Sequence, residues 1–435
     1  MQPQALPGFR DFYPADLALR DHIFRVWRRV ALRYGFEEYD GPPLEPLELY
    51  TAKSGEEIVG QLYSFTDKGG REVSLRPEMT PTLARMVAAR ANGLKKPVRW
   101  FSIPQLFRYE RQQRGRLREH FQLNCDLIGE SGYLADTEIV ALAIDAVRAF
   151  GLGPKDVRVR LSDRRLLTSL LDGLQVADGQ VPVVYQVFDK LRRNPEAASV
   201  TRLAGAGIPD ATIERLLAVA RAASWSALGD LCAGLDDVLA QGDSLRRTLE
   251  ALGAMGFGDY LDLDLSIVRG LAYYTGTVFE LFDARGELRA ICGGGRYDNL
   301  LQSLGGVDLP ALGFGMGDVV LGELLRDRGL EPEPAASVDV FLAAISQDDL
   351  PHVLGLAREL RDGGLRVEYA LAPQTVGKQL KLADARSARL AVVVGPDDRA
   401  RGEVMVKDLR RNSQESVPRE RILGRLTSMV EGVGP

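Results

Sequence analysis

The segment FRYERQQRGRLREHFQLNCDLIGE, residues 107–130, constrains the fold more than any other part of this chain. Two alternating runs flank a charged stretch with one glycine, which is the pattern of an antiparallel hairpin with a long loop. One face would carry Arg108 and Glu110 on the first strand, and Gln122, Asn124 and Asp126 on the return strand. We therefore expect a sheet whose apolar face packs on helices and whose polar face lines a cleft. The alternative is a polar face that meets bulk water.

The rest of the chain supplies helices and further strands around this hairpin. Residues 16–34 have apolar positions at helical intervals, and the prolines within 42–46 favour an extended edge or interface segment. Thr80 followed by Pro81 fits an N-cap and first helical position, for a helix that runs toward Asn92. Residues from about 186 to 255 have the composition and spacing of a helical insertion. Strand-like segments return in LDLDLSIVRG, LAYYTGTVFELFD and ELRAICGGGRYD.

A Pro- and Ala-containing linker at residues 329–337 predicts a boundary between two domains. Residues 1–328 would then form the first domain, with the helical insertion inside it. Residues 338–435 alternate strand and helix patterns, which predicts an α/β domain with a largely parallel sheet.

Composition excludes several classes of function. The chain of 435 residues has no apolar run approaching the roughly 20 residues of a membrane span, and its N-terminus lacks a signal pattern, so we expect a cytoplasmic protein with no membrane partner. Three cysteines, far apart and without a CxxC pair, indicate reduced buried thiols rather than disulfides or zinc. With only three histidines, any metal would be oxygen-bound, such as magnesium carried by a phosphate substrate.

Three clusters could carry chemistry. Residues 108–119 contain five arginines in a protein of net charge −5, and a solvated loop is the alternative to a binding role. Arg269 could neutralise a phosphate or form a structural ion pair, and the adjacent Tyr273 and Tyr274 would point to opposite faces of a strand. The run of three glycines before Arg296 matches no phosphate-binding loop, and a tight turn accounts for it equally well.

Together these segments resemble, in order and over nearly the whole chain, the histidyl-tRNA synthetase family of class II aminoacyl-tRNA synthetases. GFEEYDGPPLE resembles motif 1, the dimer-forming segment, while LRPEMT and FRYERQQRGRLRE resemble motif 2. IVRGLAYYTGTVFE and ICGGGRYDNLLQSLGG resemble the two histidine-specific signatures, and KQLKLADARSARLAVVVG with GEVMVKDL resembles the anticodon-binding domain. The resemblance implies an α+β catalytic domain built on an antiparallel sheet, class II synthetase-like, with a helical insertion and a C-terminal α/β anticodon-binding domain.

The same resemblance implies a histidine–tRNA ligase, which activates L-histidine with ATP and transfers it to the 3′ end of tRNA(His). The histidine-binding residues would be Glu78, Thr80 and Gln122 at the α-amino group, and Asp126, Tyr274 and Tyr297 around the imidazole. The ATP-binding residues would be Arg108, Glu110, Arg116 and Arg269, of which Arg108 and Arg269 would be catalytic. Arg111 and Gln113 would contact the tRNA acceptor end. The family pattern further implies a homodimer, Mg²⁺ carried by the ATP phosphates, and no protein-bound metal or zinc.

One motif departs from the family pattern. The third motif usually ends in Gly-Leu-Glu-Arg, whereas GFGMGDVVLGELL places Asp318, Val319 and Val320 at the last three positions, so the expected ATP-binding arginine is missing. We interpret this as the trait of a subgroup. The main alternative is a non-catalytic paralogue, the histidine-sensing regulatory subunit of ATP phosphoribosyltransferase, which lacks the anticodon domain. A protein that binds RNA without catalysis is a third possibility, which the intact arginine set disfavours.

Overall fold

The chain forms two compact units, Met1–Pro332 and Glu333–Pro435. The computed structural model describes residues 4–51, 59–111, 113–192, 194–268, 273–332 and 338–432. Within these ranges, no helix is both long enough and apolar enough to span a membrane.

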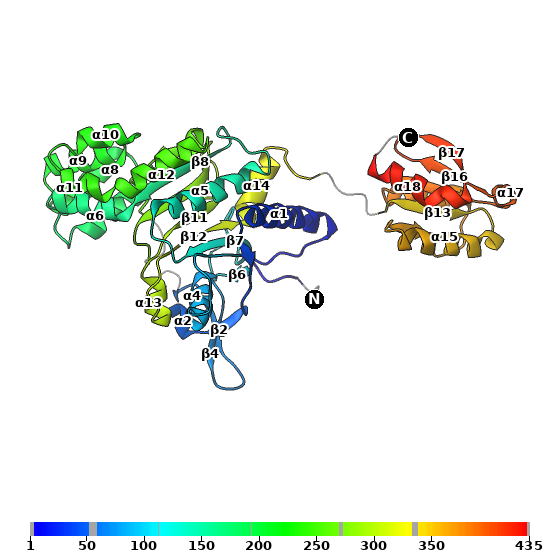
Figure 1. The fold of residues 1–435 in the computed structure, drawn as a ribbon, viewed down its shortest axis with the longest axis horizontal. Coiled ribbons are helices and arrows are strands. Elements are labelled where there is room, and N and C mark those ends of the chain that lie inside the picture. The colour runs from blue at the N-terminus through cyan, green and yellow to red at the C-terminus, as the bar shows by residue number, and fades with distance from the viewer. Residues whose placement is uncertain are drawn as a thin grey trace. The chain divides into compact units, whose positions relative to one another are not determined.

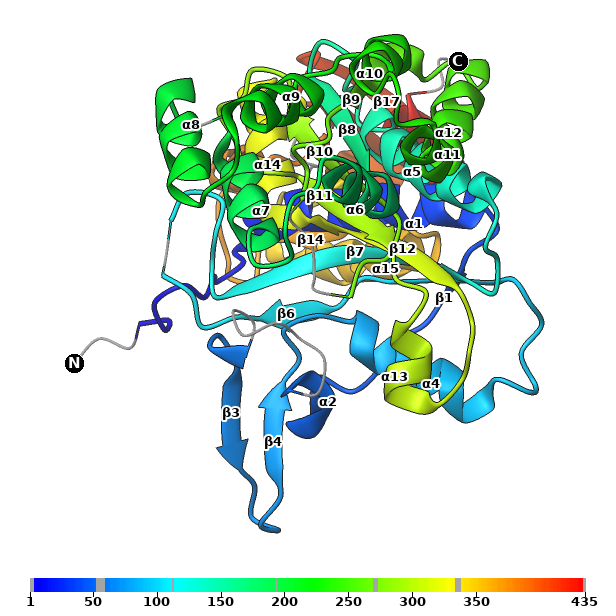
Figure 2. The same cartoon turned by 90° about the vertical axis from the view of Figure 1, so that its left-hand side faces the viewer.

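A sheet of nine strands, counted over the described residues, lies at the centre of the first unit (Figures 1 and 2). Its strands are β1 (Glu37–Glu38), β5 (Val98–Ser102), β6 (Gln105–Phe107), β7 (Glu119–Ile128), β8 (Val157–Asp163), β9 (Leu261–Leu263), β10 (Thr277–Asp283), β11 (Cys292–Arg296) and β12 (Ala311–Gly317). They are ordered β1-β5-β7-β12-β11-β10-β8-β9, and β6 pairs with β7 off this path. Every pairing from β5 to β8 is antiparallel, which confirms the expected antiparallel sheet.

The predicted hairpin is formed by β6 and β7. Phe107 pairs with Glu119 across it, and the Arg108 amide donates to the Arg118 carbonyl at 2.9 Å, so the pairing continues beyond β6. The apolar side chains Leu123, Cys125 and Leu127 of β7 are buried in the main core. The alternation in the sequence thus fixes which face of β7 is covered.

Three helices cover that apolar face: α1 (Pro14–Arg33), α5 (Tyr133–Arg148) and α14 (Asp318–Asp327). The first begins with a proline, whose fixed φ suits the first helical turn. Its Ile23, Trp27 and Val30 recur at helical spacing and are buried in the same core as β7. The helix expected over residues 16–34 is therefore confirmed.

A smaller sheet and three helices complete the part of the unit nearest the polar face. They are β2 (Leu44–Pro46), β3 (Tyr63–Thr66), β4 (Glu72–Leu75), α2 (Glu48–Thr51), α4 (Thr80–Arg90) and α13 (Leu300–Gly305). The proline-containing β2 lies at the edge of the order β2-β4-β3, as expected. Hairpin β3–β4 projects away from the large sheet in both views (Figures 1 and 2). Thr80 is not an N-cap: α4 begins at Thr80 itself, and no side chain caps it.

Helices fill the chain between β8 and β9. They are α6 (Arg164–Gly173), α7 (Val181–Lys190), α8 (Glu196–Gly205), α9 (Asp210–Ala220), α10 (Trp225–Leu231), α11 (Asp236–Gln241) and α12 (Asp243–Ala254). They gather beyond β8, in green in Figure 1. In α9, Ile213, Leu216 and Leu217 are buried at helical spacing, which is the pattern that predicted helices here.

The second unit has a five-stranded sheet among its described residues. Its elements are β13 (Val340–Ala344), α15 (Leu350–Asp362), β14 (Val367–Tyr369), α16 (Val376–Ala385), β15 (Leu390–Val394), α17 (Pro396–Ala400), β16 (Glu403–Asp408), β17 (Ser413–Pro418) and α18 (Ile422–Glu431). The order is β14-β13-β15-β16-β17. The first three strands are parallel, but β16 and β17 pair antiparallel, so the sheet is mixed rather than largely parallel.

Candidate active site

A cavity of about 300 Å³ lies against the polar face of the large sheet. It is lined by Glu78, Thr80, Arg108, Gln122, Asn124, Asp126, Tyr273, Tyr274, Phe279, Glu280, Gly293, Gly294, Tyr297, Gly313, Phe314 and Gly315. The structure therefore brings together all six residues that the resemblance assigns to histidine, although they come from distant parts of the chain. The polar face of β7 lines a cleft, and the alternative of a face open to bulk water is wrong for Gln122, Asn124 and Asp126.

Two glycines of β12 make room for polar side chains of β7. A Cβ atom on Gly313 would lie 2.2 Å from Oδ1 of Asp126 and 2.6 Å from the carbonyl oxygen of Cys125. A Cβ atom on Gly315 would lie 2.5 Å from the amide carbon of Gln122. Since both side chains cross the neighbouring strand to reach the cavity, β12 needs glycine at positions 313 and 315.

Burial raises the pKa of Asp126 to about 7, and the hydroxyl of Tyr297, which donates to Oδ1 of Asp126, opposes this rise. Tyr273 donates to Oε2 of Glu78 at 2.9 Å, and its ring centroid is 5.7 Å from that of Tyr297. The floor of the cavity is thus a set of two buried carboxylates, each held by a tyrosine. Such a floor suits a small cationic or hydrogen-bond-donating substrate.

The two adjacent tyrosines differ from expectation. Tyr273 and Tyr274 precede β10 rather than lying in a strand, and both line the cavity. Their rings meet edge to face at 5.5 Å. The assumption of opposite faces is wrong because the period of two applies only within a strand.

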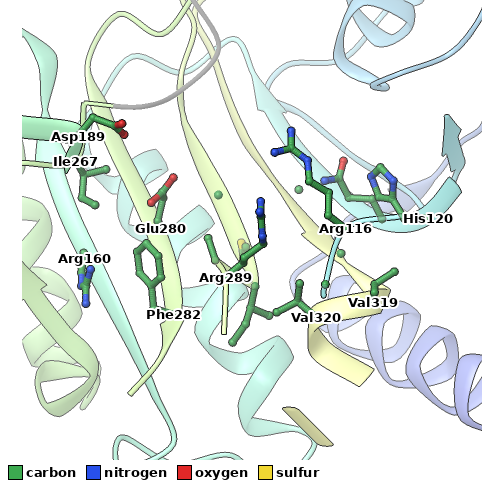
Figure 3. A pocket seen from close by; sticks show the side chains of 18 of the residues that line it. Arg116, His120, Arg160, Asp189, Ile267, Glu280, Phe282, Arg289, Val319 and Val320 are labelled. Carbon is green, nitrogen blue, oxygen red and sulfur yellow. The ribbon is translucent and has the colours of Figure 1, made fainter. Parts of the chain in front are cut away.

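A second cavity, of about 400 Å³, adjoins the first, and the two share Arg108, Gln122, Glu280, Gly293 and Gly315. Figure 3 shows Arg116 and His120 on one side of it and Asp189, Glu280 and Phe282 on the other, with Arg289 and Val320 between them. Three of the four ATP-binding residues that the resemblance implies line this cavity, namely Arg108, Glu110 and Arg116. The fourth, Arg269, lies outside the described residues.

Local contacts orient these residues. Nε of Arg108 donates to the Pro77 carbonyl at 2.9 Å, which fixes the guanidinium where the two cavities meet. Arg116 forms an ion pair with the buried carboxylate of Glu110. Burial, with Arg108 nearby, lowers the pKa of His120 to about 3, so this histidine is uncharged at neutral pH.

The loop between β6 and β7 gives different surroundings to the two residues predicted to contact tRNA. The side chain of Gln113 accepts a hydrogen bond from Arg289, at the edge of the larger cavity. Arg111 is exposed. Nε of Arg114 donates to Glu323 of α14 at 3.2 Å, as does the amide of Gly115, so this loop is docked on α14.

Sequence reasoning missed the position of Asp318. This buried carboxylate accepts from the Phe121 amide at 2.8 Å and from Nη1 of Arg10 at 2.9 Å, while Nε of Arg10 donates to Glu119 at 2.6 Å. Burial raises the pKa of Asp318, which the guanidinium of Arg10 opposes. Asp318 begins α14, where a negative charge is favoured by the helix dipole. The residue in the atypical third motif thus ties the N-terminal segment to the start of β7.

The three cysteines are buried free thiols, as expected: Cys125, Cys232 and Cys292. Among the described residues, no cluster of three or more His, Cys, Asp or Glu side chains has the arrangement of a metal site. The larger cavity nevertheless contains carboxylate oxygens, on Glu110, Asp189 and Glu280.

Comparisons with known proteins agree with this geometry. Residues 8–317 match the family described as histidyl-tRNA synthetase, and residues 339–429 match the anticodon binding domain. The chain is 46% identical to a histidine–tRNA ligase of Opitutus terrae, over 96% of this chain and 97% of that protein. It is 40% identical to one of Leptospira biflexa, over 94% and 93%. A crystal structure of histidyl-tRNA synthetase from Nostoc superposes with a TM-score of 0.85 at 25% identity, covering 99% of this chain and 100% of that one.

The antiparallel sheet, its polar face and the separate α/β unit define a class II aminoacyl-tRNA synthetase. The family match covers most of the first unit, and the identity to its members extends through both units. This chain belongs to the histidyl-tRNA synthetase family.

Proposed function

We propose that this protein is a histidine–tRNA ligase, in which the smaller cavity binds L-histidine and the larger one binds ATP. The observation that carries the proposal is that the two cavities adjoin at Arg108. Glu78, Thr80 and Gln122 line the smaller cavity and can hold the α-amino group, while Asp126, Tyr274 and Tyr297 surround the imidazole. A carboxylate can accept a hydrogen bond from the imidazole N–H, and a tyrosine hydroxyl can donate one to the unprotonated ring nitrogen.

At the junction of the cavities, the histidine carboxylate would attack the α-phosphorus of ATP, forming histidyl-adenylate and releasing pyrophosphate. The terminal ribose hydroxyl of tRNA(His) would then attack the acyl carbon and release AMP. Neither step needs a protein nucleophile, so Arg108 and Arg269 would act by positioning and by neutralising the charge that develops. Loss of one of these arginines should raise the barrier by about 2.7 to 4 kcal/mol, as for removal of one oxyanion donor.

Other residues complete this proposal. Glu110 would lie near the adenine and Arg116 toward the terminal phosphates, once ATP competes for the guanidinium that Glu110 now pairs with. Mg²⁺ would enter on the ATP phosphates, where the oxygens of Glu280 could join its coordination shell, and we propose no zinc site. Arg111 and Gln113 would meet the acceptor end of the tRNA, and the second unit would bind its anticodon.

We also propose a cytoplasmic homodimer with no membrane partner. The domain roles follow the predicted boundaries, with catalysis in residues 1–328, a linker at 329–337 and anticodon binding in 338–435. Size-exclusion chromatography with light scattering tests the dimer, since a monomer at micromolar concentration contradicts it.

The rival function, a histidine-sensing regulatory subunit, is disfavoured by a specific finding. Residues 339–429 match an anticodon binding domain, which that subunit lacks. Histidine binding alone would not separate the two functions, because both would use the smaller cavity.

The deciding experiment is histidine-dependent exchange of labelled pyrophosphate into ATP, with tRNA charging measured alongside. We expect exchange from the native chain, and a loss of about 10²- to 10³-fold for Arg269→Ala. Arg285→Ala, an exposed residue in the turn after β10, is the matched control and should keep full activity. Histidine binding without exchange would identify the regulatory function instead.

A further inference from the structure

The arginines that line the larger cavity differ in how their charges are balanced. They are Arg108, Arg116, Arg160, Arg192 and Arg289. Arg116 is paired with Glu110, and Nη2 of Arg192 is 2.8 Å from Oδ2 of Asp264. Nε of Arg160 is 3.8 Å from the same carboxylate oxygen. Within the described parts of the chain, Arg108 and Arg289 form no ion pair, so these two bring uncompensated positive charge to the cavity.

Arg289 lies on the same wall of the larger cavity as the start of α14, which contributes no charged side chain to this wall. Val319 and Val320, in the first turn of α14, line this wall with apolar side chains. A Cβ atom on Gly115 would lie 3.2 Å from Cγ2 of Val320 and 3.9 Å from Cδ of Arg289, so both side chains pack around the same glycine. Figure 3 shows the guanidinium of Arg289 extending past Val320 into the cavity. The positive charge at this wall therefore comes from the β10–β11 connection rather than from α14.

The present partner of Arg289 is a neutral one. Its Nη2 donates to Oε1 of Gln113, in the loop between β6 and β7. A phosphate carries a charge opposite to that of the guanidinium and can accept two parallel N–H donors from it, whereas the Gln113 amide oxygen is neutral. A phosphate in the cavity would therefore displace Gln113 from Arg289.

We propose that Arg289 binds the β- and γ-phosphates of ATP, and hence the pyrophosphate leaving group, at the wall where Val320 supplies no charge. This inference rests on the proposed function, because it places ATP in the larger cavity. Arg108 lines both cavities and belongs beside the α-phosphate at their junction, whereas Arg289 lines only the larger one. The phosphates farther from the amino acid are therefore the ones within its reach.

The test compares Arg289→Ala with the native chain in pyrophosphate exchange. We expect kcat/KM for ATP to fall about 10²-fold and the KM for pyrophosphate to rise, with the KM for histidine unchanged. Arg289→Lys should lose less, because it keeps the charge but not the bidentate fork. Transfer of histidine from preformed histidyl-adenylate to tRNA should be unaffected, which a general disturbance of the loop would not allow. Arg285→Ala is the control from the same connection.

A rescue variant sharpens the assignment. Adding Val320→Arg to Arg289→Ala returns a guanidinium to the same wall, and recovery of the ATP affinity supports the proposal. Titration of ATP into the native chain and Arg289→Ala gives a readout that does not depend on exchange. An unchanged ATP affinity in Arg289→Ala overturns the role of Arg289 while leaving the ligase function intact. A native chain without histidine-dependent exchange overturns the ligase function, and the titration still decides whether Arg289 binds ATP.

Discussion

The hydroxyl of Tyr297 donates a hydrogen bond to Oδ1 of Asp126 at the buried floor of the smaller cavity. The two residues are 171 positions apart in the sequence. Asp126 lies in β7 and Tyr297 directly follows β11, and β12 lies between these two strands in the sheet. Because burial raises the pKa of Asp126 to about 7, this hydrogen bond decides how much of the carboxylate is ionised near neutral pH.

Removing the donor should shift the pH dependence of histidine binding. The Tyr297 hydroxyl favours the ionised carboxylate, so Tyr297→Phe should raise the pKa of Asp126 further. We expect the KM for histidine to fall as pH rises through about 7 in the native enzyme, and the same fall to occur at higher pH in the variant. The titration of free histidine is common to both enzymes and cancels in the comparison. Superimposable profiles would show that Asp126 does not control binding.

The same carboxylate should make stability depend on pH. The pKa of Asp126 is about 7 in the folded chain but about 3.9 in an unfolded one, so the folded state holds the proton more tightly. The free energy of unfolding should therefore fall as pH rises from about 4 to about 7, and remain low above that. Asp126→Asn, which resembles the protonated acid, should gain on the order of 4 kcal/mol over the native chain at pH 8 and almost nothing at pH 4.

Denaturant unfolding of both proteins at the two pH values measures this difference. Glu287→Gln removes an exposed carboxylate and should change stability by less than about 0.5 kcal/mol at either pH. An equal effect of Asp126→Asn at pH 4 and pH 8 would mean that the carboxyl does not titrate between them.

Much of the site could be predicted because its floor is a strand. The alternation from Phe121 to Leu127 fixed the inward face of β7, and with it the positions of Gln122 and Asp126 in the cavity. The glycines of β11 and β12 can be read from the sequence, but the sequence does not show which side chains need the space they leave. Gly313 and Gly315 are needed because side chains of the neighbouring strand cross them, which only the pairing of the strands reveals.

The rest of the site depends on contacts that local patterns do not encode. Tyr273 lies outside any strand, so the strand period of two predicted its direction wrongly. Its partner Glu78 is 195 residues away. Arg10 and Asp318 are 308 residues apart. Arg289 belongs to none of the sequence motifs. Only the fold shows that it packs beside Val320 around Gly115 and can supply a positive charge there. Arg296 follows the glycine run, but it lines neither cavity. Its Nη2 is 2.6 Å from Oδ2 of the buried Asp136, so it forms a structural ion pair.

A substitution at Gly313 tests whether β12 needs the space that this glycine leaves for Asp126. Gly313→Ala would bring a methyl group within 2.2 Å of Oδ1 of Asp126 and 2.6 Å of a backbone oxygen, and the latter cannot rotate away. We expect a loss of about 1–3 kcal/mol in the free energy of unfolding, together with weaker histidine binding. Gly317→Ala, in the same strand, meets nothing within 4 Å and should leave stability nearly unchanged. Equal stabilities for the two variants would contradict this account of β12.

Arg10 should be more important for stability than its place in the N-terminal segment suggests. It neutralises Glu119 and Asp318, whose side chains are 1% and 4% exposed, so Arg10→Met leaves two buried carboxylates without a counter-charge. We expect a loss of about 3–5 kcal/mol in the free energy of unfolding at pH 8. Adding Asp318→Asn should return part of this loss, because one uncompensated charge is removed, and a double-mutant cycle measures that coupling. Arg28→Met breaks a more exposed pair with Glu38 and should cost at most about 1 kcal/mol. If Arg10→Met costs no more than Arg28→Met, the buried cluster does not hold the N-terminal segment to β7.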